Sequence, residues 1–164
     1  EPNHECKVEL PINAHLDATY VPGERLRLDL YRRLADVRNG EDVLAIEEEL
    51  IDRFGVLPEE AQTLLGVAAL RACAKSISLR EVVAQGKFVR LSPMNLPESK
   101  QLKLARMYPG SLYKSASSTV LVALPKSSAW NPSESTAPIV DTSLLAWVTQ
   151  VVTELAPTSK GSSE

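Results

Sequence analysis

The chain has 164 residues, of which 44% are hydrophobic and 24% charged, an ordinary composition for a globular protein. This length is sufficient for one domain with a substantial buried core. No apolar run approaches the ~18 residues that a membrane span requires, and the start at Glu1 follows neither an initiating Met nor a targeting leader. We therefore expect a segment excised from a larger polypeptide, although a processed chain would begin in the same way. We also expect the protein to be cytoplasmic.

Charge is unevenly distributed along the chain, although the net charge is only −3. Residues 1–70 carry 15 acidic and 7 basic residues, whereas residues 71–126 carry 2 acidic and 10 basic residues. Such asymmetry favours oriented docking on a partner, because complementary fields set register. It is equally consistent with two halves that face each other or face water.

The N-terminal half is expected to be helical after one strand. Cys6, Val8, Leu10 and Ile12 alternate with polar residues and Pro11, which predicts a half-buried strand. Leucines and valines at helical spacing then predict three helices. The first runs from Glu24 to Arg38 and is ended by Asn39-Gly40. The second runs from about Glu41 to Phe54 and is closed by Gly55, and the third runs from about Pro58 to Lys75. The third helix is expected to point Ala61, Leu64, Leu65, Ala68, Ala72 and Cys73 inward.

The C-terminal half changes to a strand pattern. The expected elements are two strands (Leu79 to Ala84, Lys87 to Leu91), a helix (Pro97 to Tyr108), two short strands (Leu112-Tyr113, Val120 to Ala123) and a helix (Thr142 to Leu155). The fold class is therefore α+β: a helical N-terminal half, a strand-strand-helix-strand-strand unit and a C-terminal helix. We expect a single domain over residues 1–156, with a Pro/Ser-rich loop at 125–138 and a disordered tail at 157–164.

No residues with the spacing of a catalytic, metal or cofactor site stand out. His4, Cys6 and His15 do not match known zinc-ligand spacing, and both Cys6 and Cys73 fall in apolar patterns. Ser111 and Lys114 formally match a serine–lysine motif, but its companion motifs are absent. No glycine-rich phosphate loop occurs. We therefore expect a domain that is not an enzyme.

The basic segment 80–114 leaves nucleic-acid contact open as an alternative function. Its bases could bind phosphates, and Phe88, Tyr108 and Tyr113 lie among them. Against this alternative, the aromatic residues follow core patterns and the whole chain is acidic. The bases are Arg80, Lys87, Arg90, Lys100, Lys103, Arg106 and Lys114.

The second predicted helix ends in a cluster of charge. At about 100° per residue, Glu49, Asp52 and Arg53 fall within roughly one third of the helix circumference, beside the apolar stripe. Such a cluster can serve as a docking site. Since Glu49 precedes Arg53 by four residues, the same pattern is consistent with an ordinary intrahelical ion pair.

Three runs of sequence carry a resemblance to a known family. They are ATYVP (residues 18–22), RLRLDLYRRL (residues 25–34) and ELIDRFGVLP (residues 49–58). Together they resemble the C-terminal domain of the bacterial transcription-repair coupling factors, the Mfd family. The likeness is specific over about residues 5–80 and weaker beyond, and the loop at 125–138 departs from the family forms.

The resemblance implies a regulatory module of a large ATP-driven DNA translocase that displaces stalled RNA polymerase and recruits UvrA. In that family the domain docks on a UvrB-like N-terminal module of the same chain and masks the surface that UvrA binds. The acid-x-x-Asp-Arg helix end of the family belongs to that interface. It corresponds here to Glu49, Asp52 and Arg53.

Overall fold

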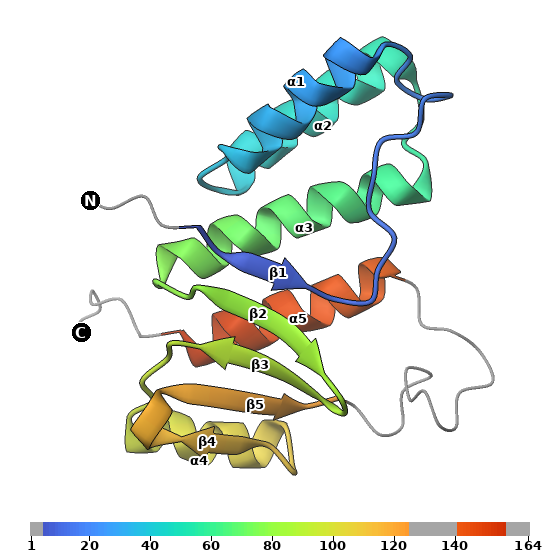
Figure 1. The fold of residues 1–164 in the computed structure, drawn as a ribbon. Helices are drawn as coiled ribbons and strands as arrows, with labels where there is room; N and C mark the ends of the chain where they lie inside the picture. The colour runs from blue at the N-terminus through green and yellow to red at the C-terminus, as the bar shows by residue number, and fades with distance from the viewer. Residues whose placement is uncertain (1–4, 125–140, 157–164) are drawn as a thin grey trace, which may run out of the picture.

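The computed structural model describes residues 5–124 and 141–156, and Figure 1 shows their fold. The predicted loop at 125–138 and tail at 157–164 lie outside the described residues. In the part of the chain that the structure describes, no helix is long and apolar enough to cross a membrane. The elements are β1 (Lys7–Glu9), α1 (Glu24–Ala35), α2 (Gly40–Phe54), α3 (Glu59–Ser76), β2 (Glu81–Gln85), β3 (Phe88–Ser92), α4 (Glu98–Met107), β4 (Leu112–Lys114), a 3-10 turn (Ser115–Ser117), β5 (Thr119–Ala123) and α5 (Asp141–Leu155).

The strands form one mixed sheet in the order β1-β2-β3-β5-β4. β1 runs parallel to β2, and every other pair is antiparallel. The side chains of Val82, Val89, Leu91, Val120 and Val122 alternate onto one face and are buried. Helices α3, α4 and α5 cover that face, because their apolar residues belong to the same buried cluster.

Helix α3 lies between two hydrophobic cores. Val67, Leu70 and Ala74 face the sheet and α5, whereas Leu65 and Ala68 face α1 and α2. The expected inward residues therefore describe mainly the side that faces α1 and α2, and Cys73 alone among them packs against the sheet core. At Gly66 an added Cβ would lie 2.9 Å from Cδ1 of Leu145, so the missing side chain lets α5 approach α3 closely.

Helices α1 and α2 form a hairpin that packs above α3 in Figure 1. The prediction that Asn39-Gly40 ends the first helix is wrong, because α1 already ends at Ala35. Asn39 instead caps the start of α2, where its side-chain oxygen accepts from the Asp42 N–H at 2.9 Å. The Asp42 carboxylate in turn accepts from the Arg38 N–H at 2.9 Å.

The α+β class and the order of elements are confirmed. The first strand is shorter than its alternating pattern predicted, covering Lys7–Glu9 rather than Cys6 to Ile12. Pro11 has no N–H to donate to a sheet, which is consistent with the early end of pairing. The predicted last helix is present as α5, and its apolar residues Leu144, Leu145, Val148, Val151, Val152 and Leu155 are buried.

Candidate functional site

Glu49 stands at the centre of the predicted charged cluster and joins the two helices of the hairpin. Its carboxylate accepts from both terminal nitrogens of Arg33 on α1, at 2.7 and 3.2 Å. It also accepts from Arg53, one turn later on α2, at 2.9 Å. A bidentate arginine–carboxylate pair fixes direction as well as distance. The cluster therefore joins α1 to α2 through Glu49.

The three hydrogen bonds hold Glu49 in its ionised form. Its pKa falls from the ordinary 4.5 to about 2, chiefly because Arg33 donates to the carboxylate and secondly because Arg53 does. The same pairing raises the pKa of Arg33. Glu49 and Arg33 are thus both charged at neutral pH.

The C-terminal end of α2 is held by the segment before α1. The Tyr20 hydroxyl donates to the Gly55 carbonyl at 2.8 Å and lies 3.3 Å from the Leu50 carbonyl. Its ring packs against Phe54 with the centroids 5.8 Å apart. Gly55 has a φ of +93°, which a residue with a side chain adopts only under strain, so glycine is required at this turn.

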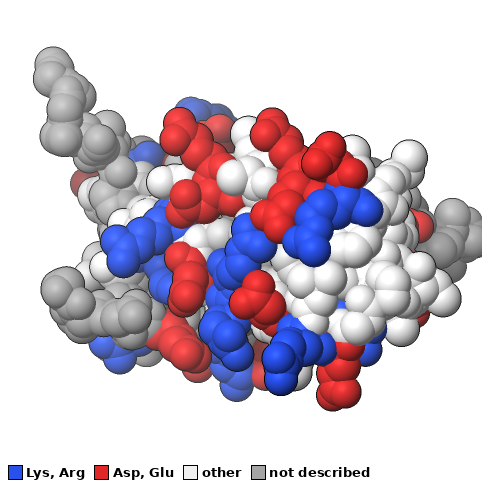
Figure 2. Space-filling view, turned by 90° about the horizontal axis from the view of Figure 1, so that it is seen from above, with Lys and Arg blue, Asp and Glu red and all other residues white. Residues whose placement is uncertain are grey.

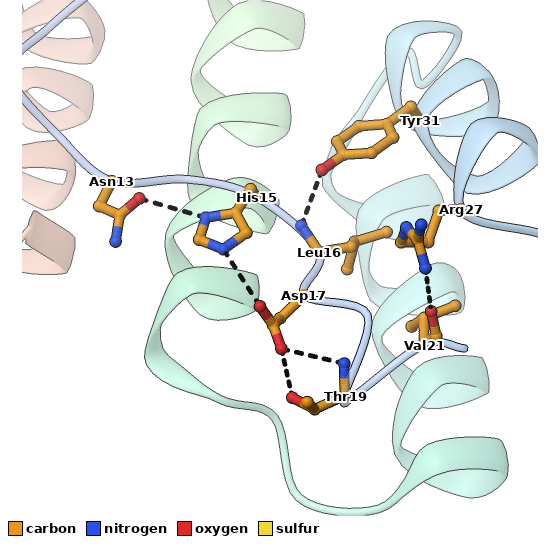
Figure 3. A network of polar contacts seen from close by, with 8 residues as sticks. All are labelled: Asn13, His15, Leu16, Asp17, Thr19, Val21, Arg27 and Tyr31. Carbon is orange, nitrogen blue, oxygen red and sulfur yellow. Dashed lines mark hydrogen bonds and ion pairs between the residues drawn. The ribbon is translucent and has the colours of Figure 1, made fainter. Parts of the chain in front are cut away.

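Further polar contacts fasten the same segment to α1 (Figure 3). The Leu16 N–H donates to the Tyr31 hydroxyl at 2.7 Å, and Arg27 donates to the Val21 carbonyl at 2.9 Å. Asp17 accepts from both the hydroxyl and the N–H of Thr19, which lowers the pKa of the Asp17 carboxyl. Residues from all three resembling runs therefore meet at one end of the helical hairpin.

Asp52 and Arg53 differ from Glu49 in how far they face solvent. Asp52 is exposed and makes no hydrogen bond or ion pair with any described residue. The Arg53 side chain remains 45% exposed, although it pairs with Glu49 and its guanidinium lies 5.2 Å from the Phe54 ring centroid. Figure 2 looks down on this side of the molecule and shows acidic and basic side chains close together beside uncharged surface. The helix end thus presents both signs of charge.

The residues considered for catalysis or metal binding have structural partners. Ser111 donates to the Tyr108 carbonyl at 2.6 Å and accepts from the Ala123 N–H at 2.8 Å. The His15 ring contacts Asn13 at 3.2 Å and Asp17 at 3.9 Å, while Cys6 is buried. His4 lies outside the described range. Among the described residues, no three His, Cys, Asp or Glu side chains gather as metal ligands would.

The basic segment 80–114 is divided in the structure. Arg90 pairs with Glu81 across the β2–β3 hairpin. Lys103 pairs with Glu154 at 2.5 Å, and Lys100 donates to the Glu154 carbonyl at 3.1 Å, so both tie α4 to α5. Three of the seven bases are thus engaged within the fold, which weakens the nucleic-acid alternative.

Comparison with known proteins identifies the family. The TRCF domain family matches residues 10–104, which is more than half of the chain. The chain belongs to this family. The transcription-repair-coupling factors of Mycobacterium bovis and Mycobacterium tuberculosis are each 39% identical to this TRCF domain protein over 153 residues, or 93% of the chain. That of Escherichia coli is 35% identical over 85 residues, or 52% of the chain. The resemblance seen in the sequence is confirmed.

The fold agrees with a solved TRCF structure. The crystal structure of the C-terminal domain of a transcription-repair coupling factor superposes with a TM-score of 0.67, covering 92% of this chain and 95% of that one at 15% identity. The chain spans about an eighth of the length of its mycobacterial relatives, since the match covers 12% of each. Its fold is therefore that of a C-terminal module rather than of a whole coupling factor.

Arg33 is the residue of the cluster that the sequence did not single out. The i,i+4 spacing links Glu49 to Arg53, but no spacing rule links Glu49 to a residue 16 positions earlier on another helix. Its only signal is a place in the resembling run at 25–34. The structure therefore brings together Glu49, Arg53 and Arg33, and leaves Asp52 free to face solvent.

Proposed function

We propose that this TRCF domain is a non-catalytic, autoinhibitory C-terminal module of a cytoplasmic, transcription-coupled DNA repair translocase. It docks on the UvrB-like N-terminal module of the same polypeptide and masks the surface that UvrA binds. Contact with UvrA and RNA polymerase is then indirect, through the parent protein. Family membership supports the parent's identity, and the relatives are named for coupling transcription to repair.

The exposed end of α2 is the single observation that carries the docking proposal. Asp52 has no partner among the described residues, and Arg53 is held in place while remaining half exposed. Charged groups at the rim of an interface give orientation and modest affinity that weakens with salt. Tethering within one polypeptide raises the effective concentration of a weak partner to the order of mM. A weak contact of this kind is therefore mostly closed yet readily released.

The proposal is tested by UvrA binding to the full-length protein. Replacing both Asp52 and Arg53 by alanine should raise UvrA affinity by about tenfold. The reason is that losing two rim contacts destabilises the closed state, relative to the open state, by about 1.4 kcal/mol. Deleting the whole domain gives the fully open affinity for comparison. Asp52 and Arg53 are better targets than Glu49, since Glu49 also joins α1 to α2.

Glu98→Ala is the matched control, because Glu98 is an exposed acid on α4, away from the helical hairpin. It should leave UvrA affinity unchanged. If the deletion raises affinity and the double variant does not, the masking surface lies elsewhere on this domain. If the deletion itself has no effect, the domain is not autoinhibitory.

A further inference from the structure

A second surface, on the other flank of α2, is distinct from the Glu49 cluster. At about 100° per residue, Glu47 and Ile51 both lie about 160° around the helix from Glu49. Glu49 and Arg53 face α1, whereas Glu47 and Ile51 border a groove between α2 and α3. A ligand in this groove therefore contacts different side chains from those of the proposed autoinhibitory interface.

The groove is apolar and open to solvent. It has a volume of about 540 Å³, and its apolar lining consists of Val43, Ile51, Val56, Leu57, Leu65 and Ala69. Val56 is 90% exposed and Ile51 46% exposed. Exposed branched side chains beside an apolar groove are typical of a surface that another chain covers.

Charge around the groove is acidic on one side and absent on the other. Helix α2 carries six acidic residues and one basic residue, and Glu47 lines the groove itself. Residues 61–70 of α3, which form the opposite wall, contain no charged residue. In the described part of the chain, Glu41, Glu47 and Glu48 have no ion-pair partner. This negative charge is therefore available to a basic ligand.

We propose that the α2–α3 groove binds an amphipathic helix of another protein that is apolar on one face and rich in Lys and Arg beside it. Grooves between packed helices recur as sites for such helices, whose anchors follow the i, i+3, i+4, i+7 pattern. The apolar face enters between Ile51 and Leu65, and the flanking bases lie over the acids of α2. Charge complementarity favours this ligand over an acidic peptide. The surface is independent of the autoinhibitory function.

The test uses a fluorescent synthetic helix of about five turns, with leucines on one face and lysines elsewhere, against the 164-residue chain. Fluorescence anisotropy should show binding that weakens as salt rises to about 0.15 M. Val56→Lys should raise the Kd by about fivefold or more, because it removes an apolar contact and adds a repelling charge. Glu47→Lys should act in the same direction.

Leu28→Lys is the matched control, since Leu28 is a 56% exposed apolar residue on α1, outside the groove. It should change the Kd by less than about twofold. Circular dichroism should show each variant folded, and Ile51→Lys replaces Val56→Lys if that variant is not. Amide shifts on peptide addition should centre on Ile51, Val56, Leu65 and Ala69.

Four results overturn the proposal. The first is equal binding of a peptide in which glutamates replace the lysines. The second is a Kd that Val56→Lys and Leu28→Lys change equally, and the third is a set of amide shifts centred on Arg33 and Arg53. The fourth is sedimentation that shows a dimer abolished by Val56→Lys, because the groove would then be occupied by a second copy of this chain.

Discussion

At the scale of single residues, the Glu49 cluster combines internal stabilisation with exposed charge. Glu49 joins α1 to α2 through Arg33, and it also holds Arg53 at the surface. Two arginines and two acids, with Asp52 included, give the group a formal charge near zero. A neutral but polar group confers orientation on a contact more than long-range attraction.

Loss of the Glu49 charge should destabilise the fold in a pH-dependent way. Because folding lowers the pKa of Glu49 from 4.5 to about 2, its stabilising contribution is complete above about pH 4.5 and disappears as pH falls through about 2. Glu49→Gln should lower the free energy of unfolding by about 1 kcal/mol at pH 7, as measured in urea. The difference from the unchanged chain should vanish near pH 2. A constant difference across this range would mean that the ion pairs do not contribute.

The sequence allowed part of this cluster to be predicted. Spacing by four residues linked Glu49 to Arg53, and the structure has that pair at 2.9 Å. The Arg33 contact depends on how α1 packs against α2, which no local pattern encodes. The role of Tyr20 was likewise hidden, because its acceptor is a backbone carbonyl 35 residues away. The docking role of Glu49, Asp52 and Arg53 stays a prediction.

At the scale of elements, α3 determines how the two halves of the fold meet. One side packs on the helical hairpin and the other on the sheet and α5. A helix buried on two sides lacks a single apolar stripe, so reading one stripe from the sequence could identify only one of its neighbours. The role of Asn39 was predicted wrongly because Asn followed by Gly is typical of both a helix end and a helix start. The hydrogen bond from the Asp42 N–H to the Asn39 side chain shows that Asn39 caps the start of α2.

A cavity beside α3 should lower the free energy of unfolding more than the truncation of an exposed side chain on α4. Leu70 is fully buried against the sheet, so Leu70→Ala should lower the free energy of unfolding by about 2–5 kcal/mol. Leu102 on α4 is 67% exposed, so Leu102→Ala should change the free energy of unfolding by less than about 0.5 kcal/mol. Chemical denaturation of both variants provides the measurement. Equal effects would show that α3 is not packed as described.

At the scale of the whole molecule, the prediction of a single domain over residues 1–156 becomes testable through cooperativity. Because α3 belongs to both cores, the hairpin and the sheet should unfold together. Trp147 packs on Tyr108 in the sheet core, with ring centroids 5.9 Å apart. In a chain that carries Trp130→Phe, the fluorescence of Trp147 should follow the same urea transition as the helical circular dichroism signal. Loss of helix before the change in fluorescence would mean two separately folding units.

The general architecture was predictable because strand and helix periods are local. The partner of β1 was not, since Lys7 pairs with Glu81 across more than seventy residues and in parallel. Local alternation shows that a strand exists, but not which edge of the sheet it joins. The five-stranded sheet order therefore had to come from the structure.

The pairing of β3 with β5, and the packing of α5 on α3, bear on where the protein can be cut. The stretch that matches the TRCF family, residues 10–104, keeps α1, α2 and α3 but lacks β1, β4, β5 and α5. In a fragment with those ends, Leu70, Val89 and Leu91 would lose the elements that shield them from water. The stretch that the family model covers is thus shorter than the stretch that the two hydrophobic cores need in order to form.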